Sequence, residues 1–224
     1  PHGGRVMDRL IFFAALFALF IPGAAMADVE TPNYTVESRD GEVEIRQYPS
    51  MIVAQTTVEG TRSAAVNQGF RILADYIFGA NEPNAKIEMT APVTQAAGGD
   101  SIAMTAPVTQ SQADGGEGSW DVRFIMPSEY TIATLPLPTD KRIDILEIGP
   151  RRVAAIQFSG FARDAKLAEK RDALMAYLAR NEMQAASAPT FAFYDPPFTL
   201  PFLRRNEVLV ELASADGDAA DGAN

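Results

Sequence analysis

The fold is decided by two stretches that lie 100 positions apart: VEIRQYPSMIVAQTTVEG at residues 43–60 and IDILEIGPRRVAAIQFSG at residues 143–160. Each stretch has apolar residues at alternate positions, then Pro49 or Gly149-Pro150, then a second alternating run that ends at Gly60 or Gly160. Apolar residues at every second position predict β-strands, and the proline positions predict turns between them. We therefore expect the same strand–turn–strand unit twice.

A segment with helical periodicity follows each unit, at about residues 61–78 and 163–180. Between positions 43 and 82, eight residues are identical to the residue 100 positions later, and Asn81-Glu82 recurs as Asn181-Glu182. These identities indicate an internal repeat. The alternative is that two independent strand–strand–helix units have similar lengths.

The first helix carries two adjacent apolar stripes. We expect the core to be contacted by one stripe, which consists of Val66, Phe70, Leu73 and Ile77. The second stripe consists of Ala65, Gly69, Ile72 and Tyr76. Because one sheet contact does not need so wide an apolar arc, the second stripe is expected to face something besides the sheet.

A shorter duplication lies between the two units. IEMTAPVTQ at residues 87–95 recurs as IAMTAPVTQ at residues 102–110, across a Gly-Gly-Asp turn signal, and we expect a β-hairpin there. Further strands are expected at 120–126 and 207–212. Two helices and about eight strands predict an α+β fold, in which two helices flank a strongly curved antiparallel sheet or barrel. We expect one domain over 28–212 and a disordered acidic tail over 213–224.

The N-terminal segment has the features of a secretory signal peptide. After Met7, the expected start, 12 apolar residues occupy positions 10–21, Pro22-Gly23 follows, and Ala25-Met26-Ala27 fits a cleavage site. A membrane-spanning helix needs about 20 apolar residues, so the segment is too short for a stable span. We expect residues 1–27 to be removed and the protein to be exported to the periplasm or secreted; a retained anchor is the alternative.

The composition excludes several classes of function. The net charge of −10 disfavours nucleic acid as a partner. The chain has no cysteine, and its single histidine is His2, which leaves no thiolate, zinc site or Ser-His-Asp triad for the folded domain. A general base could still be supplied by Glu44, Glu88 or Glu129, but these residues form no paired constellation. We expect neither an enzyme nor a metal site.

Several longer motifs resemble the SOUL family of haem-binding proteins over nearly all of residues 29–212. They are EVEIRQY at 42–48, GFRILADYIFGAN at 69–81, KIEMTAPVTQ at 86–95, RFIMPSEYT at 123–131 and YDPPFTLPFLRRNEVLVEL at 194–212. The resemblance implies a pseudo-two-fold distorted β-barrel with two flanking helices. It also implies non-covalent binding of haem or a related tetrapyrrole in an apolar groove beside the first helix.

A tetrapyrrole needs a wide apolar face, polarizable contacts and cations at its rim. The candidate binding residues are Gly69, Phe70, Arg71, Ile72, Leu73, Tyr76, Met89, Met104, Tyr194, Arg204 and Arg205. Each also has a purely structural interpretation, as core, strand or turn residue. Some family members have a histidine after the tyrosine of the first motif, where this chain has Pro49, so we expect weak axial ligation or none.

The expected function is sequestration or transport of haem or another tetrapyrrole. The alternative is a binding module for a different flat apolar molecule, such as a quinone, a lipid or a drug-like effector.

Overall fold

The computed structural model describes residues 29–82, 99–113, 118–196 and 198–213. These residues form two α-helices, α1 (Arg62–Ile77) and α2 (Asp164–Arg180), and a short 3-10 helix, η1 (Pro201–Leu203). The strands are β1 (Thr35–Asp40), β2 (Val43–Tyr48), β3 (Met51–Glu59), β4 (Asn81–Glu82), β5 (Val108–Gln112), β6 (Ser119–Ile125), β7 (Leu137–Pro138), β8 (Asp144–Ile148), β9 (Arg151–Phe158), β10 (Thr190–Phe193) and β11 (Asn206–Glu211). No helix within the described ranges is long and apolar enough to cross a bilayer.

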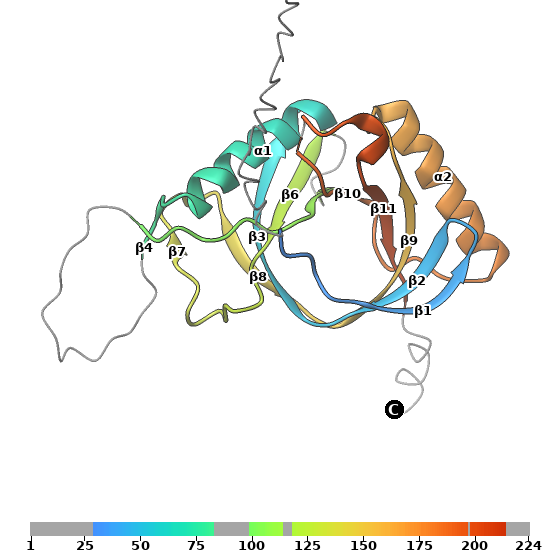
Figure 1. Ribbon diagram of the computed structural model, residues 1–224, viewed down its shortest axis with the longest axis horizontal. Coiled ribbons are helices and arrows are strands. Elements are labelled where there is room, and N and C mark those ends of the chain that lie inside the picture. Colours follow the sequence, from blue (N-terminus) through green and yellow to red (C-terminus); the bar gives the residue numbers. More distant parts are fainter. Residues whose placement is uncertain (1–28, 83–98, 114–117, 197, 214–224) are drawn as a thin grey trace, which may run out of the picture.

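Nine of the strands form one curled antiparallel sheet (Figure 1), in the order β1-β2-β9-β11-β10-β5-β6-β3-β8. The equivalent strands of the two repeats are β2 and β8, β3 and β9, β5 and β10, and β6 and β11. Apart from β1, equivalent strands lie at the same distance from opposite ends of this order. The first half contributes β2, β3, α1, β5 and β6, and the second contributes β8, β9, α2, β10 and β11. The expected α+β fold with a distorted barrel and two helices is confirmed.

The strands at 43–60 and 143–160 pair between the repeats rather than within them. The pairs run from Val43↔Ile156 to Tyr48↔Arg151 between β2 and β9, and from Met51↔Ile148 to Gln55↔Asp144 between β3 and β8. Both ladders keep the same register, so β2–β3 and β8–β9 are two long bent strands lying antiparallel. The proline positions predicted as turns are the bends of these strands. This pairing curls the sheet back on itself.

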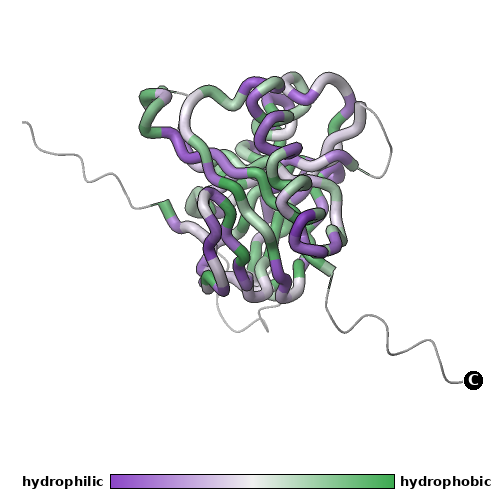
Figure 2. The backbone as a smooth tube through the Cα atoms, turned by 90° about the vertical axis from the view of Figure 1, so that its right-hand side faces the viewer, coloured by the Kyte–Doolittle hydropathy of each residue, from purple (hydrophilic) through white to green (hydrophobic). Residues whose placement is uncertain are grey.

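Both helices lie on the outer face of the sheet (Figure 1). α1 packs on β3 and β6, and α2 packs on β9 and β11. Each helix has its own apolar core, with Leu73 and Val122 in the first and Leu174 and Val208 in the second. In Figure 2 the hydrophobic stretches of the chain run through the middle of the molecule. The inner face of the sheet is left free of helices.

The two glycines that end the predicted units occupy equivalent backbone positions. Gly60 has a φ of 128° and Gly160 a φ of 99°, and each precedes the start of a helix. Residues with a Cβ rarely adopt these angles, so both positions favour glycine. The shared conformation explains why this residue recurs in the repeat.

Three of the expected features fall at least partly outside the described residues. The signal peptide and nearly all of the acidic tail lie outside them, as does the first copy of the MTAPVTQ duplication at 87–95. The second copy contributes β5, whose two edges pair with β6 and β10. A hairpin between the two copies therefore does not account for the pairing of β5.

Candidate ligand-binding site

The inner face of the sheet encloses a cavity of about 740 Å³. Because side chains alternate along a strand, the residues facing the cavity are those that do not face the helices. Its apolar wall consists of Met51, Val53, Ile125, Leu146, Ile148, Val153 and Leu209. Its polar lining includes Tyr48, Gln55, Ser111, Asp121, Arg123, Arg151, Tyr194 and Glu211. The cavity thus combines an apolar wall with several hydrogen-bonding groups, as small-molecule sites do.

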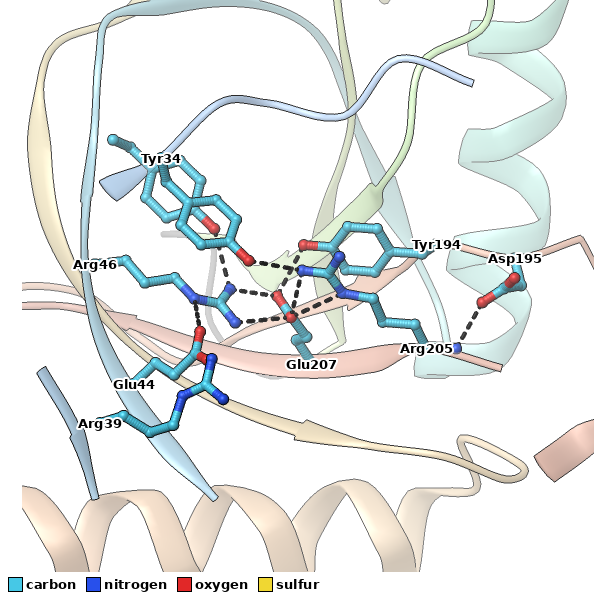
Figure 3. Close-up of polar contacts among 9 residues, drawn as sticks. Tyr34, Arg39, Glu44, Arg46, Tyr194, Asp195, Arg205 and Glu207 are labelled. Atoms are coloured by element: carbon cyan, nitrogen blue, oxygen red, sulfur yellow. Dashed lines mark hydrogen bonds and ion pairs between the residues drawn. The ribbon is translucent and has the colours of Figure 1, made fainter. Parts of the chain in front are cut away.

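A buried ionic cluster centred on Glu207 lies on the same face of the sheet. The Glu207 carboxylate is fully buried and accepts hydrogen bonds from Arg46 Nη1 at 2.8 Å and Nη2 at 3.0 Å. Arg205 donates to it from Nε at 3.0 Å and from Nη2 at 2.8 Å, and the Tyr194 hydroxyl donates at 2.8 Å. Figure 3 shows the two guanidinium groups on opposite sides of the carboxylate.

The charges in the cluster stabilise one another. Burial alone would raise the pKa of Glu207, but the hydrogen bonds and charge of Arg46, together with Arg205 and Tyr194, lower it below its ordinary value. Burial and the neighbouring Glu207 carboxylate raise the pKa of Tyr194 well above its ordinary value. At neutral pH Glu207 is therefore ionised and Tyr194 is protonated. Neither group is poised to exchange a proton, which makes the cluster a structural element rather than an acid–base pair.

The cluster also holds aromatic rings in place beside the cavity. The Arg46 guanidinium lies 4.4 Å from the centre of the Tyr34 ring, and the Arg205 guanidinium lies 4.0 Å from that of Tyr194. Arg46 Nη1 also donates to the Tyr48 hydroxyl at 3.2 Å. Tyr48 and Tyr194 both line the cavity. The cluster therefore fixes one part of the cavity wall.

The structure divides the predicted binding residues among several places. Four residues of α1 lie in the core beneath the helix: Gly69, Ile72, Leu73 and Tyr76. Phe70 and Arg71 are exposed on α1, and Met104 is also exposed. Tyr194 and Arg205 belong to the Glu207 cluster, Arg204 lies near η1, and Met89 is outside the described residues.

The packing predicted for the stripes of α1 is confirmed for Leu73 and Ile77, which are buried in the core, and was wrong for Phe70 and for the second stripe. The stripe with Gly69 and Tyr76 packs on the sheet, together with Leu73, whereas Phe70 is 38% exposed. A Cβ on Gly69 would lie 2.6 Å from Cβ of Val122, so this glycine lets the helix approach β6 closely. The Tyr76 hydroxyl donates to the Pro136 carbonyl at 2.6 Å, which ties that side chain into the core. Contact of these residues with a ligand stays a prediction.

A separate apolar surface surrounds η1. It consists of Phe161, Phe198, Leu200, Phe202 and Leu203, each at least half exposed. Arg204 lies beside this surface, with its guanidinium 5.1 Å from the centre of the Phe161 ring, and its Nε donates to the Thr199 carbonyl at 2.8 Å. Large exposed apolar patches commonly mark binding surfaces. We call this set of five residues the η1 surface.

The η1 surface lies where the two α-helices begin. The Gly160 amide donates to the Pro201 carbonyl at 2.8 Å, which holds η1 against the start of α2. Arg62, at the start of α1, donates to the Asp164 carboxylate at 2.5 Å and to the Ala162 carbonyl at 3.4 Å. In Figure 1 the red η1 segment lies between the first turns of α1 and α2.

Sequence reasoning missed both the inner cavity and the η1 surface. The polar cavity residues, such as Gln55, Asp121 and Arg123, appear in the sequence as the polar positions of alternating strands, which is the pattern of a solvent-facing side. The η1 surface had a visible signal in the run FTLPFL at 198–203, which places four large apolar residues around Pro201.

Known proteins resemble this chain over most of its length. The model of the SOUL heme-binding protein family matches residues 29–211. Heme-binding protein 1 of Xenopus laevis is 30% identical over 166 residues, which cover 74% of this chain and 80% of that protein. Heme-binding protein 2 of Mus musculus is 30% identical over 176 residues, covering 77% and 79%.

Among solved structures, the C-terminal domain of EcmrR has the same fold. It superimposes with a TM-score of 0.54 over 81% of this chain and 98% of that domain, at 11% identity. This likeness concerns the fold alone, whereas the family match and the two relatives rest on sequence. From these matches we conclude that the chain belongs to the SOUL heme-binding protein family.

Proposed function

We propose that the protein binds haem or a related tetrapyrrole non-covalently, to sequester or transport it, and that it is not an enzyme. The observation that carries the proposal is the η1 surface, an exposed apolar area bordered by arginines in a chain of this family. A flat apolar ligand would cover its side chains, and Arg204 and Arg163 are placed to pair with carboxylates at the ligand's rim.

The groove is proposed to extend from the η1 surface along the exposed edge of α1. Phe70 lies eight residues beyond Arg62, or about 12 Å along the helix. Its ring packs against Phe124 with 5.2 Å between centroids and remains 38% exposed. Arg71 is exposed next to it. This location keeps the ligand beside the first helix, on residues that are accessible.

The described residues fit capture of a flat ring better than strong iron ligation. The folded domain has no histidine and no cysteine. Two tyrosines that line the inner cavity already have hydrogen-bond partners: the Tyr194 hydroxyl donates to Glu207, and the Tyr48 hydroxyl accepts from Arg46. Haem bound at the η1 surface would contribute its ring and carboxylates to binding, and the chain's arginines and aromatic side chains would hold it.

A spectral titration tests this binding mode. Haem and iron-free protoporphyrin should bind tag-free protein with dissociation constants within about tenfold of each other, or about 1.4 kcal/mol. A much stronger preference for haem, with a six-coordinate low-spin spectrum, would contradict capture without strong ligation.

A surface variant tests the location. The double substitution Phe198→Ser with Phe202→Ser should weaken binding of both ligands by more than tenfold, because it removes the most exposed rings of the η1 surface. The matched control is Phe78→Ser, which removes a ring that is 66% exposed at the other end of α1. Equal losses in the two variants would place the ligand elsewhere.

We also propose that the protein is exported after cleavage behind Ala27. The support is the apolar stretch at 10–21 followed by Ala25-Met26-Ala27. N-terminal sequencing of the exported protein should begin at Asp28. A protein that stays with the membrane fraction after a high-salt wash would contradict this proposal.

A further inference from the structure

The inner cavity contains a cation whose charge is incompletely satisfied. Arg151 enters the cavity from the start of β9, beside the bend of the β8–β9 strand. Its Nη2 donates to the thioether sulfur of Met51 at 3.4 Å, and its guanidinium lies 5.6 Å from the centre of the Tyr48 ring. Its buried Nη1 has no hydrogen-bond partner among the described residues. A thioether is a weak acceptor, so the guanidinium lacks the acceptors that a buried cation normally has.

The second arginine in the cavity provides the contrast. Arg123 donates to Gln55 at 2.5 Å, to Ser111 at 3.1 Å and to the Asp121 carboxylate at 3.1 Å. Arg151 forms no ion pair with any described carboxylate, although Glu211 is near enough to attract it. Burial lowers the pKa of Arg151, and the attraction of Glu211 offsets this only in part. The part of the chain that the structure describes therefore supplies a partly buried positive charge without a hydrogen-bonded anion.

The rest of the cavity sets the shape and polarity of a partner for Arg151. The apolar side chains of Val53, Ile125, Leu146, Val153 and Leu209 surround the remaining space. A volume of about 740 Å³ falls within the usual range of small-molecule sites. An occupant that satisfies both features has an apolar body and one anionic end.

We propose that the inner cavity binds an apolar monocarboxylic acid, with its carboxylate paired to Arg151 and its body along the apolar wall. This site goes beyond the proposed tetrapyrrole site, because it lies on the face of the sheet opposite the helices. The carboxylates of the cavity do not prevent this pairing. Asp121 is already bound by Arg123, Glu147 is exposed, and Glu211 is half-buried without bonding to Arg151.

The test uses a fluorescent fatty acid, dansylated undecanoic acid, and its methyl ester. The two probes share the apolar body and differ in the charge that Arg151 would bind. The full-length wild-type protein should bind the acid at least tenfold more tightly than the ester. Equal affinity for the two probes would overturn the proposal without any variant.

Arg151→Met should remove this preference by weakening binding of the acid at least tenfold and leaving the ester nearly unchanged. The matched control is Arg152→Met, which changes the next residue on the opposite face of β9, where Arg152 pairs with Glu37 at 2.7 Å. Should Arg151→Met fail to fold, Arg151→Lys keeps the charge on a different geometry and should show an intermediate preference. Unchanged preference in a folded Arg151 variant would refute the assignment.

Competition separates this site from the tetrapyrrole site. Protein saturated with protoporphyrin should still bind the dansylated acid, and the η1 surface variant should bind it normally. Stoichiometric displacement of the acid by protoporphyrin would show one shared site and would overturn the proposal.

Discussion

Glu207 is the single carboxylate that receives hydrogen bonds from both arginines and the tyrosine of the buried cluster. A charged network of this kind is costly to bury, and it is tolerated here because each donor finds an acceptor. Glu207 is fully buried and Arg46 is 1% exposed, so water cannot replace either partner. The shape of the inner face depends on this one side chain.

Glu207→Gln should destabilise the protein by about 3–5 kcal/mol near neutral pH, because Arg205 loses its counter-charge and Arg46 keeps only its ion pair with Glu44. Urea unfolding followed by circular dichroism measures the loss. The control is Glu37→Gln, which removes a carboxylate from the exposed pair with Arg152 and should cost only about 0–1 kcal/mol. Similar losses in both variants would show that burial of the cluster has little effect on its strength.

The same carboxylate should make stability depend on acid pH. The folded-state pKa of Glu207 lies below its unfolded value of about 4.3, so the stabilisation is complete above that pH and is lost as the pH falls through the folded value. Wild-type protein should therefore lose stability below about pH 4, and Glu207→Gln should lose less over that interval. Parallel pH profiles for the two proteins would be inconsistent with a titrating Glu207.

Residue-scale features of the site were the hardest to predict from the sequence. Glu44, Arg46 and Tyr48 alternate with apolar residues in β2, which is equally typical of a strand with one side in solvent. These polar residues face the interior only because the sheet curls around them. That curl depends on pairing between segments 100 positions apart, so local periodicity could not reveal the cavity.

At the scale of elements, the contact between α1 and β6 depends on the absence of a side chain at Gly69. The sequence predicted the extent of α1 well, because Thr61 accepts from the Ala64 amide as an N-cap and the apolar period is regular. It predicted the burial of Leu73 and Ile77 but not that of the second stripe. The two stripes are adjacent and similarly apolar, and the close packing that Gly69 permits brings the second stripe into the core.

Gly69→Ala should destabilise the protein by about 1–3 kcal/mol, although alanine favours helix formation by about 1 kcal/mol. The added methyl would lie 2.6 Å from Cβ and Cγ2 of Val122. Thermal and urea unfolding measure the change. Gln68→Ala, at an exposed position of the same helix, serves as the control and should have almost no effect.

A double-mutant cycle identifies the cause. Val122→Ala removes Cγ1 and Cγ2, two of the three Val122 atoms that meet the new methyl, and keeps Cβ. Combining it with Gly69→Ala should therefore cost less than the sum of the single variants by about 0.5–3 kcal/mol. Strictly additive changes would show that the γ-methyl groups of Val122 do not limit the approach of α1.

At the scale of the whole molecule, the repeat was the most predictable feature. Eight identities at a spacing of 100 mark equivalent positions, and the register of β2–β9 and β3–β8 shows them related by a pseudo-two-fold arrangement. The sequence could not show that strands pair between the repeats, since the order of strands depends on long-range contacts. It also left open which apolar surface lies outside the core.

The two halves of the molecule should unfold together. Each helix covers its own core, yet both halves share the β2–β3 and β8–β9 ladder, and Trp120 packs against both cores. Leu174→Ala empties space in the second core and should destabilise the protein by about 2–5 kcal/mol. Because the ladder couples the halves, fluorescence of Trp120, the single tryptophan, and far-ultraviolet circular dichroism should show one transition, and the variant should shift both signals equally.

The control is Met175→Ala, at a neighbouring side chain that is 38% exposed, and it should shift neither signal appreciably. Separate transitions in Leu174→Ala, with the Trp120 signal unshifted, would mean that each helix and its half of the sheet unfold independently.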